Sequence, residues 1–169
     1  MLFRSSPAAV LLGDVQAVRI ASQRSLRALG VATPRHIERH FIRYVYPNLR
    51  DVLARLRREG TIEQVEVLDA EAVPFPEEWF VHSEDLPQLE RIEAGEWEPR
   101  TTLLSPFDNL ICDRDRTELL WNFLYRAEFY TPKEKRVYGF YALPILHGEE
   151  LIGRKSVDRK STRLNSSHS

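Results

Sequence analysis

A run of polar side chains between Leu103 and Arg116, LLSPFDNLICDRDR, has the composition of a loop that presents side chains. Carboxylates accept hydrogen bonds and guanidinium groups bind anions such as phosphate, so this mixture suits a polar, charged ligand. Ser105-Pro106 predicts a turn, because proline fixes its own φ and keeps Ser105 out of the helical region. Asp108-Asn109 then closes the turn through side-chain hydrogen bonds to the backbone. Asp113 is the predicted N-cap of a short helix that ends before Tyr125.

The residues after this loop extend the pattern with further tyrosines, cations and a glutamate: Thr117, Tyr125, Glu128, Tyr130, Pro132, Lys135, Arg136, Tyr138, Gly139, Tyr141, Leu143 and Pro144. Together with Ser105, Pro106, Phe107, Asp108 and Asp113, this pattern resembles the YcaQ/AlkZ-like family of bacterial winged-helix DNA glycosylases, which excise alkylated and crosslinked bases. The chain departs from the family at Asn109, where a proline is usual, and at Cys112, where a large aromatic residue is usual. The resemblance covers most of residues 14 to 157.

The resemblance implies a DNA cleft around this segment, with the cations on phosphates. Its lining would include Asp108, Asp113, Arg114, Arg116, Tyr125, Glu128, Lys135 and Arg136. The alternative is structural: Asp108 and Asp113 cap the turn and the helix, and the two arginines pair with them or with Glu128. Tyr138, Phe140 and Tyr141 are expected in core and strand packing rather than as platforms on which bases stack.

The catalytic residues of the family are not recognised in this chain. In the family, a Gln-aliphatic-Gln or Gln-aliphatic-Asp triplet in the first winged helix hydrolyses the bond between base and sugar. Gln64-Val65-Glu66 has a similar spacing, but it lies on the first wing strand of a different unit. We therefore interpret it as ordinary strand alternation, and whether the chain is itself an enzyme stays open.

Upstream, the hydrophobic spacing predicts a winged helix-turn-helix over residues 14 to 82. Asp14 is the expected N-cap of a helix that Gly30 ends, and Thr33-Pro34 opens a second helix. Pro47 to Glu59 is the third helix, in the position of a recognition helix. The β-prone runs Ile62 to Val67 and Trp79 to Val81 form the two strands of the wing.

Arginines concentrate on the second and third of these helices. Arg35, Arg43, Arg50, Arg55, Arg57 and Arg58 are the candidate DNA-binding residues there. Such contacts give affinity that depends on salt and not on sequence. A solvated helix face is an equally good explanation of the charge. Acidic residues in the wing loop (Asp69, Glu71, Glu77 and Glu78) count against strong contact with DNA.

Residues 83 to 100 are expected to connect the two parts, with a short helix from Ser83 to Glu90. Residues 101 to 157 should then form a small β-rich subdomain that holds the loop and the short helix. Its strands are predicted at Tyr125 to Tyr130 and at Arg136 to Leu146. His147-Gly148 makes a turn into Leu151-Ile152. The predicted fold class is therefore α+β.

The ends of the chain carry little folding information. Residues 1 to 13 are expected to be linker or mis-started sequence, and Asp158 to His168 matches the translation of a common sequencing adapter. The chain has 24 Lys+Arg and 25 Asp+Glu, a net charge of −1. Without the three cations and one acid of residues 158 to 169, the counts become 21 and 24, a net charge of −3. Net charge thus gives DNA binding no support, and we expect a fragment that lacks both ends.

A chain of 169 residues has room for one ordinary domain or two small ones. The single cysteine excludes an intrachain disulfide, the histidines have no converging ligand spacing, and no apolar run reaches membrane-spanning length. We expect a cytoplasmic monomer without metal or cofactor, whose partner is double-stranded and damaged DNA. The competing interpretations are a non-catalytic winged-helix regulator, and a piece of a protein that aggregates instead of folding.

Overall fold

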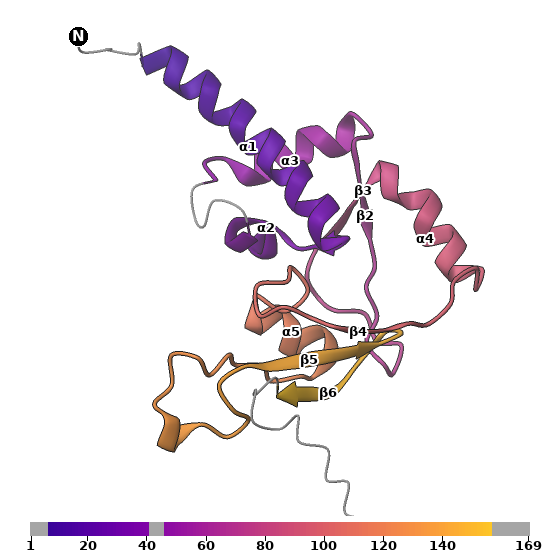
Figure 1. The fold of residues 1–169 in the computed structure, drawn as a ribbon. Helices are drawn as coiled ribbons and strands as arrows, with labels where there is room; N and C mark the ends of the chain where they lie inside the picture. Colours follow the sequence, from indigo (N-terminus) through magenta and orange to yellow (C-terminus); the bar gives the residue numbers. More distant parts are fainter. Residues whose placement is uncertain (1–6, 41–45, 157–169) are drawn as a thin grey trace, which may run out of the picture. The chain divides into compact units, whose positions relative to one another are not determined.

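The computed structural model describes residues 7–40 and 46–156 and forms two compact units, Met1–Trp97 and Glu98–Ser169 (Figure 1). We call them unit 1 and unit 2. Both units contain helices and strands, which confirms the predicted α+β class. The boundary falls between Trp97 and Glu98, where the backbone has no regular secondary structure.

Unit 1 begins with the long helix α1 (Pro7–Leu29). The prediction that Asp14 caps this helix was wrong, because the helical backbone runs through that residue from Pro7. The physical reason lies in the preceding residues. Proline is favourable in a first turn, and the alanines and leucines that follow it are strong helix formers. Gly30, at φ 74°, ends the helix as predicted.

Helix α2 (Pro34–His40) begins at the expected cap. The Thr33 hydroxyl accepts the backbone N–H of His36 at 3.3 Å, and the backbone N–H of Thr33 donates in return to His36 Nδ1 at 3.2 Å. Two amides that the helix leaves without partners are satisfied by this exchange. Histidine takes the place that glutamate or glutamine usually holds in such a capping box.

Helix α3 (Leu49–Arg58) lies within the predicted range Pro47 to Glu59 and starts two residues later. Asn48, with φ 56°, forms its left-handed entry, and Gly60, with φ 70°, follows its last turn. Leu49, Val52, Leu53 and Leu56 are buried along one side. In a helix with 3.6 residues per turn this spacing leaves the opposite side to solvent.

The two predicted strands of this unit are β2 (Ile62–Val65) and β3 (Trp79–His82), which pair antiparallel as expected for a hairpin, with Ile62 opposite His82 and Val65 opposite Trp79. A further strand, β1 (Val31–Ala32), pairs with β3 on its other side and was not predicted. The sheet order is therefore β1-β3-β2. Because β3 is central, all four of its residues are buried.

The core of unit 1 lies between the helices and this sheet. Helix α1 contacts both α3 and β3 (Figure 1). Leu26, Ile37, Leu56 and Ile62 are completely buried there. The indole of Trp79, also fully buried, lies 5.1 Å from the His36 ring between centroids. Burial of such side chains supplies most of the stabilisation of a small unit.

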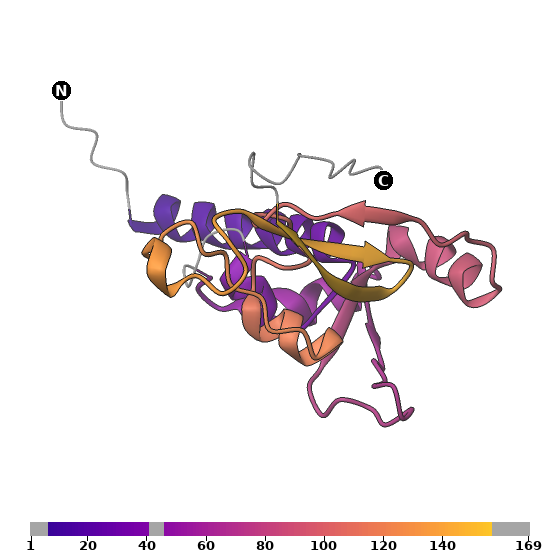
Figure 2. The same ribbon diagram turned by 60° about the horizontal axis from the view of Figure 1, so that its bottom comes forward.

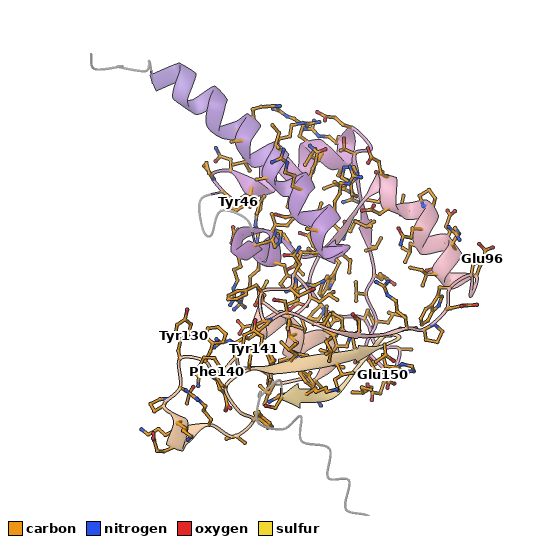
Figure 3. The ribbon with its side chains drawn as sticks, viewed as in Figure 1. Tyr46, Glu96, Tyr130, Phe140, Tyr141 and Glu150 are labelled. Carbon is orange, nitrogen blue, oxygen red and sulfur yellow. The ribbon has the colours of Figure 1, made fainter. Side chains whose placement is uncertain are left out.

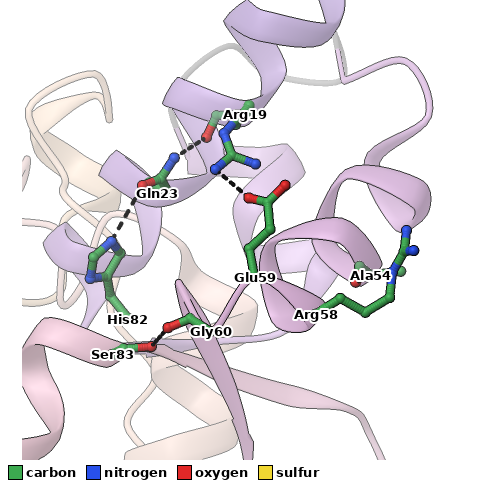
Figure 4. A network of polar contacts seen from close by, with 8 residues as sticks. All are labelled: Arg19, Gln23, Ala54, Arg58, Glu59, Gly60, His82 and Ser83. Atoms are coloured by element: carbon green, nitrogen blue, oxygen red, sulfur yellow. Dashed lines mark hydrogen bonds and ion pairs between the residues drawn. The ribbon is translucent and has the colours of Figure 1, made fainter.

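Polar contacts also join α1 to the elements around it (Figure 4). Arg19 forms an ion pair of 2.5 Å with Glu59 at the end of α3, and His82 Nε2 lies 3.4 Å from Gln23 Oε1. The Ser83 hydroxyl donates to the carbonyl of Gly60 at 2.6 Å. Exposed ion pairs contribute little, so these contacts fix orientation more than they add stability.

The loop between β2 and β3 extends away from the helices of unit 1 (Figure 2). The Asp69 carboxylate accepts the backbone N–H groups of Glu71 at 3.0 Å and Val73 at 2.8 Å, and Leu68 forms an isolated bridge with Pro74. One of the acidic residues of this loop therefore has a structural role. After β3, a 3-10 turn at Ser83–Asp85 leads into α4 (Leu86–Glu93), so the predicted short helix is present and extends three residues further.

Unit 2 contains a three-stranded antiparallel sheet of order β4-β5-β6. The hairpin of β5 (Ala142–His147) and β6 (Glu150–Ser156) turns at Gly148, as predicted. Strand β4 (Thr101–Leu103) pairs with β5 and was not predicted. Helix α5 (Arg114–Trp121) is capped by Asp113, as expected, and Asn122 ends it in the left-handed region.

Two strand predictions in unit 2 need correction. Tyr125 to Tyr130 is not a strand, and the strand expected from Arg136 begins only at Ala142. A 3-10 turn at Lys133–Lys135 (η2) lies between these segments. The backbone amides of residues 137 to 139 are instead bound by the side chain of Glu128, so they do not need a sheet partner. A small core forms beside this loop around Leu104, Ile111 and Tyr125.

Candidate nucleic-acid interface

The exposed side of α3 carries the densest positive charge that the sequence predicted. Arg50, Arg55, Arg57 and Arg58 are all exposed, opposite the buried leucines and valine of the same helix. Asp51 is the only acidic residue of α3 and also lies exposed, in the first turn. Since guanidinium groups bind phosphate oxygens with two parallel hydrogen bonds, this side of α3 is chemically suited to a nucleic-acid backbone. We call the four arginines the α3 basic face.

The members of the α3 basic face differ in their surroundings. The Arg58 Nε–H donates to the carbonyl of Ala54 at 3.4 Å, one turn earlier. Arg55 borders a shallow hollow between α1 and the start of α3, together with Arg19 and Asp51. Arg50 and Arg57 are exposed like the other two arginines. The four arginines are thus spread along the helix, so that each can contact a different phosphate.

Two predicted residues stand outside this face. Arg35 is exposed in the first turn of α2. Arg43 lies outside the described residues.

Gln64, on β2, and Glu66, just after it, are both exposed. The burial of β2 does not alternate, since Glu63 and Gln64 are both exposed, and Glu66 lies beyond the end of the strand, so the interpretation of this triplet as ordinary strand alternation is not supported.

In unit 2, Asp108 and Asp113 cap the turn and the helix, as that part of the structural alternative predicted. The Asp108 carboxylate accepts the backbone N–H of Leu110 at 3.0 Å, and the Ser105 hydroxyl accepts that of Phe107 at 3.3 Å. Asp113 accepts the N–H of Arg116 at 3.5 Å as the N-cap of α5. These acids therefore shape the turn and the helix, which is the commonest use of aspartate at such positions.

The two arginines of α5 have different environments. Arg114 is exposed and remains a candidate for phosphate contact. Arg116 is only 2% exposed, and burial lowers its pKa, although Asp113 and then Cys112 act in the opposite direction. Its guanidinium carbon lies 5.9 Å from the centre of the Trp121 ring. Because a buried cation does not reach a phosphate, we remove Arg116 from the candidate interface and interpret it as part of the packing of unit 2.

Glu128 has a structural environment of a different kind. Its carboxylate accepts three backbone N–H groups, from Val137 at 3.0 Å, Tyr138 at 2.8 Å and Gly139 at 3.1 Å. These bonds lower the pKa of Glu128, and the bond from Val137 has the largest effect. Nearby Arg154 also lowers this pKa. A carboxylate with three hydrogen-bond donors is favoured in its ionised form, and here its bonds hold the backbone of residues 137 to 139. We therefore do not assign it to a reaction.

Arg154, on β6, is the centre of an aromatic cluster. Its guanidinium carbon lies 4.0 Å from the centre of the Tyr138 ring and 4.8 Å from that of Phe123. Its Nη2–H donates to the carbonyl of Leu124. Burial raises the pKa of Tyr125, whose hydroxyl donates to the carbonyl of Ala142 at 3.0 Å. Because Arg154 is distant in sequence from Phe123, Tyr125 and Tyr138, no local pattern predicts this cluster.

The expectation that Tyr138, Phe140 and Tyr141 lie in the core was wrong, because all three side chains are exposed. Lys135 is also exposed, on η2. Arg136 is half-buried: its Nε–H donates to the carbonyl of Thr131 at 2.7 Å, and its guanidinium carbon lies 4.8 Å from the centre of the Phe140 ring. Aromatic rings and cations thus share one exposed loop.

Within residues 7–40 and 46–156, no group of three or more His, Cys, Asp or Glu side chains could hold a metal ion. In the same part of the chain, no helix is both long and apolar enough to cross a membrane.

Residues 3–166 match a family of proteins described as DNA glycosylase AlkZ-like. This match covers nearly all of the sequence, so the chain belongs to the AlkZ-like DNA glycosylase family, as the motif around Ser105 and Asp108 predicted. Membership supports a DNA-repair function of the glycosylase type, with DNA as the substrate. No solved structure matches the chain.

Proposed function

We propose that this chain contributes binding of double-stranded DNA to a repair protein of the glycosylase type, and that it binds the duplex through the α3 basic face. The observation that carries the proposal is the exposure of Arg50, Arg55, Arg57 and Arg58 on one side of one helix. Affinity from phosphate contacts depends on salt and not on base sequence. That property suits a protein that must search for damage anywhere in a genome.

Unit 1 is, in this proposal, a winged helix-turn-helix. The order of its elements supports the assignment: helix, short strand, two further helices and then a two-stranded hairpin. Helix α3 follows α2 in the position of a recognition helix, and the β2–β3 loop takes the position of the wing. Arg35 would add a contact from α2. In unit 2, the exposed Arg114 and Lys135, with the half-buried Arg136, supply further cations.

The catalytic step is not part of what we assign to these residues. Hydrolysis of the N-glycosidic bond needs a polar group that holds water near the anomeric carbon and a group that stabilises the developing positive charge. Gln64 and Glu66 belong to a unit other than the one that carries the catalytic triplet in the family. We propose that the chain on its own binds DNA as a monomer and does not cleave the bond.

The test is fluorescence anisotropy with a labelled DNA duplex, repeated over a series of salt concentrations. We expect Arg50→Ala/Arg58→Ala to weaken binding and to reduce the slope of log K against log salt by about 2, since each phosphate contact contributes about 0.9. The matched control is Arg24→Ala/Arg27→Ala, which removes the same charge from exposed positions of α1. Equal slopes for wild type and the α3 variant would contradict the proposal.

The same measurement separates repair from regulation. A non-catalytic winged-helix regulator would prefer one sequence, because each mismatched base pair in a specific site costs about 1–3 kcal/mol. We expect duplexes of unrelated sequence to bind equally. A preference of tenfold or more for one of them would favour the regulator.

A further inference from the structure

A group of four aromatic rings in unit 2 lies outside its buried core, with three rings exposed and the fourth half-buried. Phe129 is at its centre: its ring centroid lies 6.1 Å from that of Phe107, 4.4 Å from that of Tyr130 and 6.3 Å from that of Tyr141. Phe107 is 72% exposed and Tyr130 is 89% exposed. We call these four residues the aromatic surface. Figure 3 labels Tyr130 and Tyr141, together with Phe140, along the loop between α5 and β5.

Such exposure is unusual and needs an explanation. Large apolar side chains that gather at the surface of a protein commonly mark a binding site. Unit 2 has its own core around Leu104, Ile111 and Tyr125, and the aromatic surface is not part of it. Its rings come from two separate segments, the Ser105–Asp108 turn and the loop after α5, which meet through the contact between Phe107 and Phe129.

Polar contacts cross the loop that carries three of these rings. The Glu128 carboxylate binds the amides of residues 137 to 139, and Arg136 donates to the carbonyl of Thr131 across the same loop. Phe129 and Tyr130 directly follow Glu128. Since fixed groups lose little entropy on binding, the rings are suited to receive flat ligands.

The charge of this segment also points to a class of ligand. Residues 126 to 141 contain four basic residues (Arg126, Lys133, Lys135 and Arg136) and two acidic ones (Glu128 and Glu134), a net charge of +2, whereas the whole chain is at −1. The charge of Glu128 is already bound by backbone amides. Lys133, Lys135 and Arg126 are exposed. The surface therefore combines aromatic rings with cations.

We propose that the aromatic surface stacks unpaired bases of single-stranded or locally opened DNA, with Lys133 and Lys135 on the adjacent phosphates. Aromatic rings beside cations are the usual means of binding single strands, because every base has a flat face that stacks on a ring. Paired bases inside a duplex hide these faces. The inference rests on the proposed function, and it adds a second DNA site that recognises a different form of the ligand from the α3 basic face.

The test uses the full chain with two probes, a 5′-fluorescein-labelled oligo(dT) and a labelled duplex of the same length. Phe107→Ala/Tyr130→Ala should weaken binding of oligo(dT) roughly fivefold or more, since stacking of each base contributes about 1–3 kcal/mol. Duplex binding should not change. Tyr130→Phe, which keeps the ring, should bind oligo(dT) like wild type. Leu124→Ala is the matched control, since it removes an exposed apolar side chain of unit 2 outside the aromatic surface. Circular dichroism should show that all variants fold, as the substituted side chains are exposed.

Three results would overturn the inference. The first is oligo(dT) binding that is unaffected in Phe107→Ala/Tyr130→Ala, and the second is an equal loss of affinity for both probes. The third is a wild-type chain that self-associates on size exclusion and a Phe107→Ala/Tyr130→Ala variant that does not, which would mean that the rings form an interface between two copies of the chain. Failure of this inference is distinguishable from failure of the proposed function. Duplex binding that depends on Arg50 and Arg58, without oligo(dT) binding, would support the proposed function and contradict the stacking site. Oligo(dT) binding that depends on Phe107 and Tyr130, with duplex binding that does not depend on Arg50 and Arg58, would support the stacking site and contradict the role of the α3 basic face.

Discussion

The carboxylate of Glu128 accepts the backbone N–H of Tyr138 at 2.8 Å, and the same group holds the amides on either side of that residue. A single ionised side chain thus replaces the sheet partner that three consecutive amides would otherwise need. The pKa of Glu128 is lowered for the same reason, the bond from Val137 having the largest effect. The fold of the loop in unit 2 therefore depends on this charge.

The first prediction follows from the sign of that pKa shift. In the folded chain Glu128 releases its proton at a lower pH than in the unfolded chain, where the pKa is about 4.3, so the unfolded state binds more protons in acid. The contribution of Glu128 is complete above that value and is lost as the pH falls through the folded pKa. We expect Glu128→Gln to lower the melting temperature near neutral pH and to flatten its decline below about pH 4.3.

Thermal unfolding followed by circular dichroism over this pH range is the measurement. Glu134→Gln, which removes an exposed glutamate of the same loop, is the control and should lower the melting temperature near neutral pH less than Glu128→Gln does. If Glu128→Gln kept the full acid dependence of the wild type, another carboxylate would be responsible for it.

The second prediction concerns Gly139, whose N–H also binds Glu128. Its φ is 100°, a conformation that L residues rarely adopt, and a Cβ there would lie 2.8 Å from Ser156 Oγ. We expect Gly139→Ala to destabilise the chain by about 1–3 kcal/mol, mostly through backbone strain. Urea denaturation would measure the loss.

A second variant separates the two causes. Ser156→Ala removes the hydroxyl and leaves the Ser156 Cβ position at 3.7 Å, an ordinary contact distance. If strain dominates, Gly139→Ala should cost nearly the same in a Ser156→Ala background. Full recovery in that background would show that the contact with the hydroxyl was the whole effect.

Much of unit 1 could be predicted from the sequence because its signals are local. The leucine spacing of α3, the cap at Thr33 and the β-prone run at Trp79 each lie within one short segment. Strand β1 could not be predicted, since the two residues Val31–Ala32 are too few to show alternation and pair only through β3. The start of α1 was missed because aspartate is a common N-cap residue, and the sequence alone does not distinguish Asp14 inside a helix from an aspartate at a helix start.

Unit 2 was harder to predict because its structure depends on contacts between distant residues. The alternation from Tyr125 to Tyr130 is typical of a strand, but Tyr125 donates to the carbonyl of Ala142 and Glu128 binds amides nine to eleven residues away. In the candidate site, the exposure of the α3 arginines could be predicted from the periodicity of the helix. The burial of Arg116 did not, because residue type alone predicts that arginine is exposed.

The third prediction uses the contrast between Arg114 and Arg116, two residues apart on α5. Arg116 is buried, so Arg116→Ala should leave a void and destabilise the chain by roughly 1–3 kcal/mol. Arg114 is exposed, so Arg114→Ala should change stability by less than about 0.5 kcal/mol and weaken duplex binding instead. Chemical denaturation and anisotropy, applied to both variants, give the comparison. The opposite pattern, with stability depending on Arg114, would reverse our assignment of the two residues.

The last prediction tests the reciprocal contact between Thr33 and His36 at the start of α2. Thr33→Ala removes the hydroxyl that accepts the N–H of His36 and should destabilise the chain by about 1 kcal/mol, the usual cost of losing an N-cap. For a chain of this size that corresponds to a fall of about 2–4 °C in melting temperature. Thr33→Ser keeps the hydroxyl and should retain most of the stability. Because Thr33 is buried, its methyl group also has neighbours, and equal destabilisation by serine and alanine would show that packing of the methyl group, not the capping bond, stabilises the start of α2.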